Sequence, residues 1–200
     1  MKKILLFTAL LVCTLFSFAQ VDSREKDIAK QLVSANRVAL GLSTTDVNDG
    51  IIAGSYVITG TSIRVVYLQQ GYKGIPVYNQ LRTIAFKDGK VASNMGAPFA
   101  DMFRQTKGHS GRASTTPVNA LQKVFAETGI TPLENAVPIA TMNEGKKFEF
   151  GKLGIADENI KAELIWVPVD NKEMRLAWQV LLAPSRIVDS WLMQVDADNN

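Results

Sequence analysis

Four segments rich in β-branched and aromatic residues follow one another closely, and they constrain the fold more than any other feature of the sequence. They cover residues 55–59, 63–70, 75–86 and 91–94, and glycine-containing turns separate them. The last turn contains Asp88-Gly89, a dipeptide typical of tight β-hairpins. The pattern therefore predicts an antiparallel meander.

A helix is expected before this meander. It begins at Asp22, with Glu25 three residues later as in a capping box, and it ends near Gly41. One face carries apolar residues at helical spacing, namely Ile28, Leu32, Ala35 and Ala39. We expect this face to be buried, and we expect a polar linker to follow it as far as Asp49-Gly50.

The second half of the chain repeats the plan of a helix followed by strands. Thr116 is the expected N-cap, Pro117 the first helical residue and Gly129 the end. The apolar stripe of this helix is Val118, Leu121, Val124 and Phe125. A proline-containing connection leads to strands expected at 162–169, 175–182 and 191–196. Each strand carries one tryptophan, and we expect Trp166, Trp178 and Trp191 to lie in the core.

The first residues predict export. Lys2 and Lys3 precede an apolar run over 4–16, and Ser17-Phe18-Ala19 supplies small residues for cleavage, so residues 1–20 are predicted to be a signal peptide. The run is too short to span a membrane, and we expect a periplasmic or extracellular chain without a membrane anchor. A lipoprotein signal at Cys13 is disfavoured because bulky Val12 precedes the cysteine.

Signal cleavage removes the sole cysteine, Cys13, which excludes disulfides and thiolate metal sites from the mature chain. It also removes two lysines from a chain with a formal net charge of +3. The small surplus that remains does not predict nucleic-acid binding, which needs a clustered basic face. We divide the rest into units at 21–100 and 116–200, joined by a glycine-rich linker at 101–115.

Residue types suited to catalysis are scarce. His109 is the only histidine, so a two-histidine zinc site and an H-E-x-x-H helix are excluded from this chain, and no G-x-S-x-G motif occurs. We expect His109 to be an exposed loop residue. The run Asp196-Ala197-Asp198-Asn199-Asn200 lacks the glycine and distal glutamate of a calcium loop, so we expect the end of a strand followed by a polar turn. Nothing fixes the separation of Glu144 and Glu149, so they do not indicate an acid/base pair. We therefore expect no catalytic residue, metal or cofactor here.

The segment Tyr67-Leu68-Gln69-Gln70-Gly71-Tyr72-Lys73-Gly74-Ile75-Pro76-Val77-Tyr78-Asn79 resembles the core of the FTP domain, the fungalysin/thermolysin propeptide. The segments 175–180 and 191–197 are similar to the closing strands of the PepSY-like region that follows in such precursors. In that family the aspartate-alanine pair usually precedes a glycine-containing turn, whereas here Asp198-Asn199-Asn200 follows, so the pattern looks shortened. The residues that carry the resemblance are Tyr67, Gln69, Gly74, Pro76, Trp178 and Asp196.

The resemblance implies an α+β fold of two helix-plus-antiparallel-sheet units with an FTP/PepSY-like, cystatin-like layout. It implies a non-catalytic pro-region that acts as intramolecular chaperone and inhibitor of a secreted fungalysin-like zinc metallopeptidase, in cis or in trans. Zinc would belong to that partner, and most of the six residues would be architectural. The alternative is a free-standing exported inhibitor or ligand-binding module of the same fold.

Overall fold

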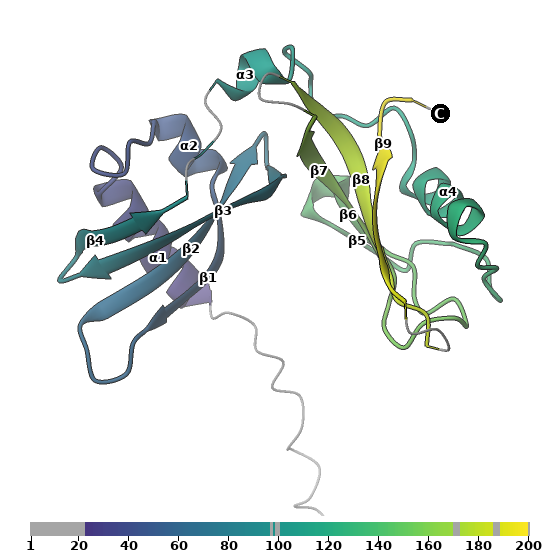
Figure 1. The fold of residues 1–200 in the computed structure, drawn as a ribbon, viewed down its shortest axis with the longest axis horizontal. Helices are drawn as coiled ribbons and strands as arrows, with labels where there is room; N and C mark the ends of the chain where they lie inside the picture. The colour runs from purple at the N-terminus through teal and green to yellow at the C-terminus, as the bar shows by residue number, and fades with distance from the viewer. Residues whose placement is uncertain (1–22, 97, 99–100, 170–172, 186–188, 200) are drawn as a thin grey trace, which may run out of the picture.

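The computed structural model describes residues 23–96, 98, 101–169, 173–185 and 189–199. Over these ranges the chain is mixed α+β, with four α-helices and a nine-stranded, mostly antiparallel sheet (Figure 1). None of the described helices combines the length and the apolar character needed to cross a bilayer. The predicted signal peptide at 1–20 lies outside the described residues.

The predicted meander is confirmed. Its strands are β1 (Ile51–Val57), β2 (Ile63–Tyr72), β3 (Ile75–Lys87) and β4 (Lys90–Met95), each antiparallel to the next. Two-residue turns join β2 to β3 at Lys73-Gly74 and β3 to β4 at Asp88-Gly89, and all four residues have positive φ. Positive φ at both central residues gives the turn a twist that matches the flanking strands, so each turn fixes a hairpin.

The first helix is shorter than expected and turns a different face inward. The described part of α1 (Ser23–Ala35) ends six residues before Gly41, and its buried residues are Ala29 and Val33. Ile28 and Leu32 are half-buried, whereas Ala35 and Ala39 are exposed, so the predicted stripe was wrong by about one residue. The inward face is set by the sheet side chains it meets, chiefly Val66, Leu68, Ile84 and Phe86.

The expected polar linker before Asp49-Gly50 was also wrong, because it contains a second helix, α2 (Thr44–Asp49). The Ser43 hydroxyl accepts the Asp46 N–H, and the Asp46 carboxylate accepts the Ser43 N–H in return. This is a capping box with aspartate in place of glutamate. It lets a six-residue helix form and bury Val47.

The second helix of the prediction is confirmed as α4 (Pro117–Thr128). The Thr116 hydroxyl accepts the Asn119 N–H, and Gly129 ends the helix in the left-handed conformation. Its buried residues include three of the four predicted, Leu121, Val124 and Phe125, and Val118 is half-buried. The helix covers one face of the strands β7 (Lys161–Pro168), β8 (Met174–Leu182) and β9 (Trp191–Asp196) (Figure 1).

The alternation in β8 is confirmed as well. Leu176, Trp178, Val180 and Leu182 are buried on the face toward α4. The core placement of the tryptophans is confirmed: Trp166 and Trp178 are buried, and Trp191 packs half-buried against the same core. The proline-containing connection holds two short strands that were not predicted, β5 (Ala140–Met142) and β6 (Lys147–Glu149), with a 3-10 turn at Asn143–Gly145 between them.

The two halves are joined by the tip of the β2–β3 hairpin. Gln69 pairs with Leu81 but Gly71 pairs with Pro76, so β3 bulges between Pro76 and Leu81. A bulge bends its strand away from its partner. Ile75 at the tip and Val77 within the bulge are fully buried in the core of the second half, and Val77 forms a parallel bridge to Trp166 of β7.

Candidate functional site

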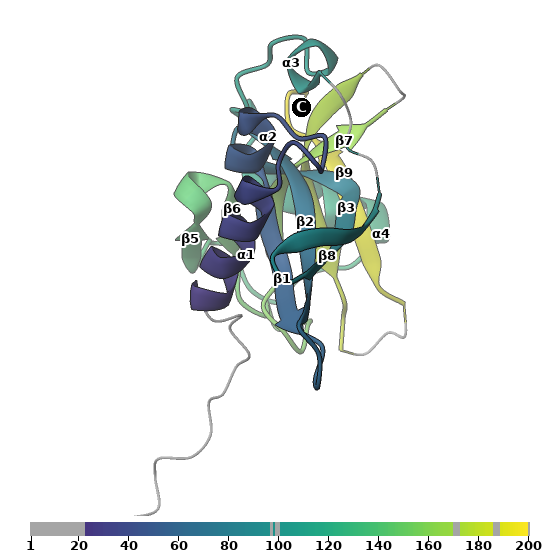
Figure 2. The same cartoon turned by 90° about the vertical axis from the view of Figure 1, so that its left-hand side faces the viewer.

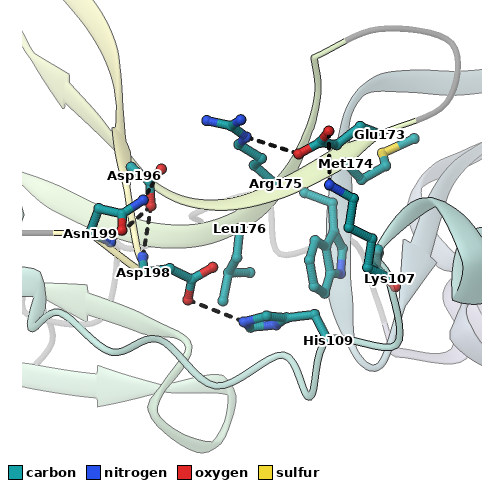
Figure 3. A pocket seen from close by; sticks show the side chains of 11 residues that line it. Lys107, His109, Glu173, Met174, Arg175, Leu176, Asp196, Asp198 and Asn199 are labelled. Atoms are coloured by element: carbon teal, nitrogen blue, oxygen red, sulfur yellow. Dashed lines mark hydrogen bonds and ion pairs between the residues drawn. The ribbon is translucent and has the colours of Figure 1, made fainter.

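A cleft of about 350 Å³ lies where the linker segment 106–109 meets the start of β8 and the end of β9 (Figure 3). Trp166, Met174 and Leu176 supply apolar lining, and Asn199 closes the side next to β9. The titratable residues around it are Lys107, His109, Glu173, Arg175, Asp196 and Asp198. At this cleft, ionisable side chains from three separate segments of the chain converge.

The segment 101–115 that leads to this cleft is packed against the protein. It contains a short helix, α3 (Met102–Gln105), whose first turn is capped by the Asp101 carboxylate. Met102 and Thr106 are buried, and the Thr106 hydroxyl donates to the Met102 carbonyl. The loop after α3 therefore starts from a fixed point, which is what positions His109.

The expectation of an exposed side chain at His109 was wrong. The imidazole is 29% exposed, and its Nε2 lies 3.1 Å from Oδ1 of Asp198. The Gly111 N–H donates to Nδ1 over 3.0 Å. The imidazole also makes a T-shaped contact with the ring of Trp166, with 5.6 Å between ring centroids.

These contacts fix the role of the imidazole. Because Nδ1 accepts the Gly111 N–H, the neutral ring carries its proton on Nε2 and donates it to Asp198. A general base needs a free nitrogen lone pair within reach of a substrate proton. Here Nδ1 is already occupied by the backbone, so the arrangement holds the loop to the end of β9.

The loop that carries His109, together with Trp166 of β7, also holds the hairpin tip in place. The Lys73 ammonium donates to the His109 carbonyl over 2.6 Å, and the Trp166 indole N–H donates to the Tyr72 carbonyl over 3.0 Å. Tyr72 also packs its ring near that of Trp166, at 6.0 Å. Trp166 and His109 thus connect the first half, the linker and the last strand at one point. The sequence offered no local signal for this, since Tyr72, His109 and Trp166 are far apart along the chain.

Glu173 is the acidic residue on the wall of the cleft across from His109 (Figure 3). The Lys107 ammonium lies 3.1 Å from its carboxylate and the Arg175 guanidinium 3.2 Å. Hydrogen bonds from Lys107 and then from Arg175 hold the pKa of Glu173 below its ordinary value. Both cations are largely exposed, so these ion pairs contribute little to stability.

Asp196, one of the residues that carries the family resemblance, caps the turn that follows β9. Its Oδ1 accepts the backbone N–H groups of Asp198 and Asn199, and its Oδ2 accepts the Asn199 amide. Burial raises the pKa of Asp196, but these hydrogen bonds outweigh it and the pKa lies below the ordinary value. The expected polar turn after β9 is confirmed.

The other residues of the resemblance are spread over four further places. Gln69 and Pro76 line a notch of about 250 Å³ beside the β3 bulge. There Gln69 donates its side-chain amide to the Val77 carbonyl, which steadies the bulge. Gly74 has a φ of +70° in the turn at the hairpin tip, which favours glycine. Tyr67 faces Tyr56 on the first half of the sheet, with 6.2 Å between the rings.

Trp178 is buried under α4 and donates its indole N–H to the Thr115 carbonyl over 3.1 Å. The six residues therefore do not form one site: each supports a turn, a bulge or a packing contact where it lies. The Glu144 carboxylate pairs with Lys146, and the Glu149 carboxylate pairs with Lys161 and accepts the Asn159 amide. Within the described ranges, no three His, Cys, Asp or Glu side chains form a group suited to a metal ion.

No protein-family model matches the chain, and no curated protein matches it either.

Proposed function

We propose that this chain is the non-catalytic pro-region of a secreted fungalysin-like zinc metallopeptidase, and that it acts as intramolecular chaperone and inhibitor of that enzyme. We infer that its two helix-plus-sheet units follow the FTP/PepSY, cystatin-like plan. The predicted signal peptide directs export of the chain. Zinc belongs to the peptidase partner.

The observation that carries the proposal is the position of the segment Tyr67–Asn79, on which the resemblance rests. This segment forms the hairpin tip and the β3 bulge that lock the two halves together. A joint of this kind makes one stiff body out of two small units. A stiff binder loses little conformational entropy on association, which favours tight binding of a folded partner.

Binding of this kind accounts for both roles. A module that binds the folded peptidase and not its unfolded chain stabilises it by roughly 2.7 kcal/mol when present at a hundred times its Kd. The same complex blocks the peptidase wherever the module overlaps the active-site cleft. Neither role requires the chain to carry a catalytic group, and His109, with Nδ1 accepting a backbone N–H, is consistent with that.

The test uses the mature chain and a fungalysin-type catalytic domain encoded in the same genome. We expect saturable inhibition of peptide hydrolysis and a higher yield of active enzyme on refolding when the chain is added. An equal amount of an unrelated exported protein serves as control. No inhibition and no gain in refolding, at micromolar concentrations of the chain, would refute the proposal.

The cleft favours a second candidate, a free-standing exported ligand-binding module. Its volume of about 350 Å³ and its apolar lining with charged walls suit a small charged molecule. Under this alternative the mature chain persists uncleaved in the medium and is stabilised by a small ligand, with no effect on peptidases. Hydrolytic activity of the pure chain that is lost in His109→Ala would instead indicate an enzyme.

A further inference from the structure

One face of the β1–β4 sheet is open and almost uncharged. The register places Val66, Leu68, Ile84 and Phe86 on the side of α1, where they are buried. Alternate residues point to the opposite side, which we call the open face. It includes Tyr56, Tyr67, Leu81, Thr83, Ser93 and Met95. Figures 1 and 2 show α1 on one side of this sheet and no described helix of the first half on the other.

The open face carries no charge along most of its length. Tyr56 is 48% exposed, Leu81 47% and Met95 64%. The β3 residues on this side from Leu81 to Ala85 are uncharged. The residues that the register places opposite them on β2 and β4 are uncharged as well. A solvated face of an antiparallel sheet normally carries polar and charged side chains. A broad uncharged face with exposed aromatic and aliphatic side chains marks a protein contact.

The second half of the chain provides the contrast. Its sheet also has one face under a helix and one open face, but that open face carries cross-strand ion pairs. Lys147 lies 2.9 Å from Glu163 and Lys161 lies 3.4 Å from Glu149. Leu181 pairs with Lys161 and so lies on this charged face, 54% exposed. The two halves therefore share an architecture, but the open face of the first half is largely uncharged and that of the second half is charged.

The rim of the uncharged face indicates the partner's chemistry. Lys87 and Lys90 pair with each other at the far end of β3 and β4 and are both exposed, with one acid, Asp88, between them. Charges at the rim of an interface steer association and fix orientation, while an uncharged centre contributes affinity. A charged patch placed against the centre would lose its hydration with no counter-charge to replace it.

We propose that the open face of β1–β4 is the surface that docks the metallopeptidase domain, through an uncharged apolar patch on that domain bordered by acidic residues opposite Lys87 and Lys90. This inference rests on the proposed function and assigns its contact surface. The exposed apolar residues of this surface are Tyr56, Leu81 and Met95.

The test compares two substitutions of the same kind on the two open faces. Leu81→Glu places a carboxylate on the uncharged face, at the end away from Lys87 and Lys90, and Leu181→Glu places one at similar exposure on the charged face. Binding to the fungalysin-type catalytic domain is measured by titration calorimetry at low and at moderate salt. We expect Leu81→Glu to weaken binding at least about tenfold, as for an apolar side chain that becomes buried in an interface. We expect Leu181→Glu to stay within about twofold of the unmodified chain.

Met95→Glu repeats the test at a more exposed position, and thermal melting checks that each variant is folded. Equal binding by all variants would overturn the docking surface while leaving the proposed function in place. Binding absent already in the unmodified chain would overturn the proposed function and this inference together. A homodimer of the unmodified chain that Leu81→Glu dissociates, with peptidase binding unchanged, would show that a second copy occupies the face instead.

Discussion

Two isoleucines on one strand test whether the hairpin tip belongs to the core of the second half. Ile75 and Ile84 both lie on β3 and both are fully buried. Ile75 packs with the core of the second half, whereas Ile84 packs with the core under α1. Ile75→Ala and Ile84→Ala therefore remove the same atoms from the same strand in different cores.

Truncation of a buried isoleucine to alanine costs about 2–5 kcal/mol, through lost burial and the cavity that remains. Part of the surroundings of Ile75 is the loop at Gly111, where a Cβ added to the glycine would lie 3.3 Å from Cδ1 of Ile75, and a loop can close partly over the gap. We therefore expect a loss near the middle of that range, about 3 kcal/mol. For a chain of this size this corresponds to a fall in Tm of roughly 6–12 °C.

Hydrogen exchange followed by mass spectrometry locates each effect. Ile75→Ala should raise exchange mainly in α4, β7 and β8, although the substitution lies in the first half of the sequence. Ile84→Ala should raise it mainly in α1, β1 and β2. The reasoning fails if Ile75→Ala costs less than about 1 kcal/mol, well below the usual range for such truncations, or if its effect on exchange stays within residues 23–96.

Three further predictions concern single contacts. Trp166→Phe keeps an aromatic ring but leaves the Tyr72 carbonyl without its indole donor, so we expect a loss of about 1–3 kcal/mol in urea denaturation, and an unchanged midpoint would contradict it. Thr116→Ala removes the cap of α4 and should cost about 0.5–2 kcal/mol by the same measurement, while Thr116→Ser should cost far less. The pKa of Asp196 is lowered in the folded chain, so its carboxylate adds stability above the ordinary aspartate pKa of about 3.9, and this is lost as the pH falls through the folded value. Asp196→Asn should therefore flatten the acid limb of a stability-against-pH curve, whereas replacement of the exposed Asp157 by Asn should leave it as steep as before.

Elements whose signals are local could be predicted from the amino-acid sequence. The Asp88-Gly89 turn, the Thr116-Pro117 start of α4 and the alternation in β8 each depend on residues within a few positions of one another, and all three are present in the structure. Such signals work because turn geometry, helix capping and strand periodicity are set by the backbone and its nearest side chains. The capping box of α2 was of the same kind and could have been found if aspartate had been admitted in the place of glutamate.

The buried face of α1 depends on contacts that form only when the chain folds, because the sheet side chains that meet the helix select that face. The same is true of the cleft. His109 looked like a free loop residue because Asp198 and Trp166, which hold it, are distant in the sequence. The bulge in β3 sends the hairpin tip into the second core, and no periodicity of a single strand records which core will receive it. Local patterns set the elements of this protein, while contacts between distant residues set its joint, its cleft and its uncharged face.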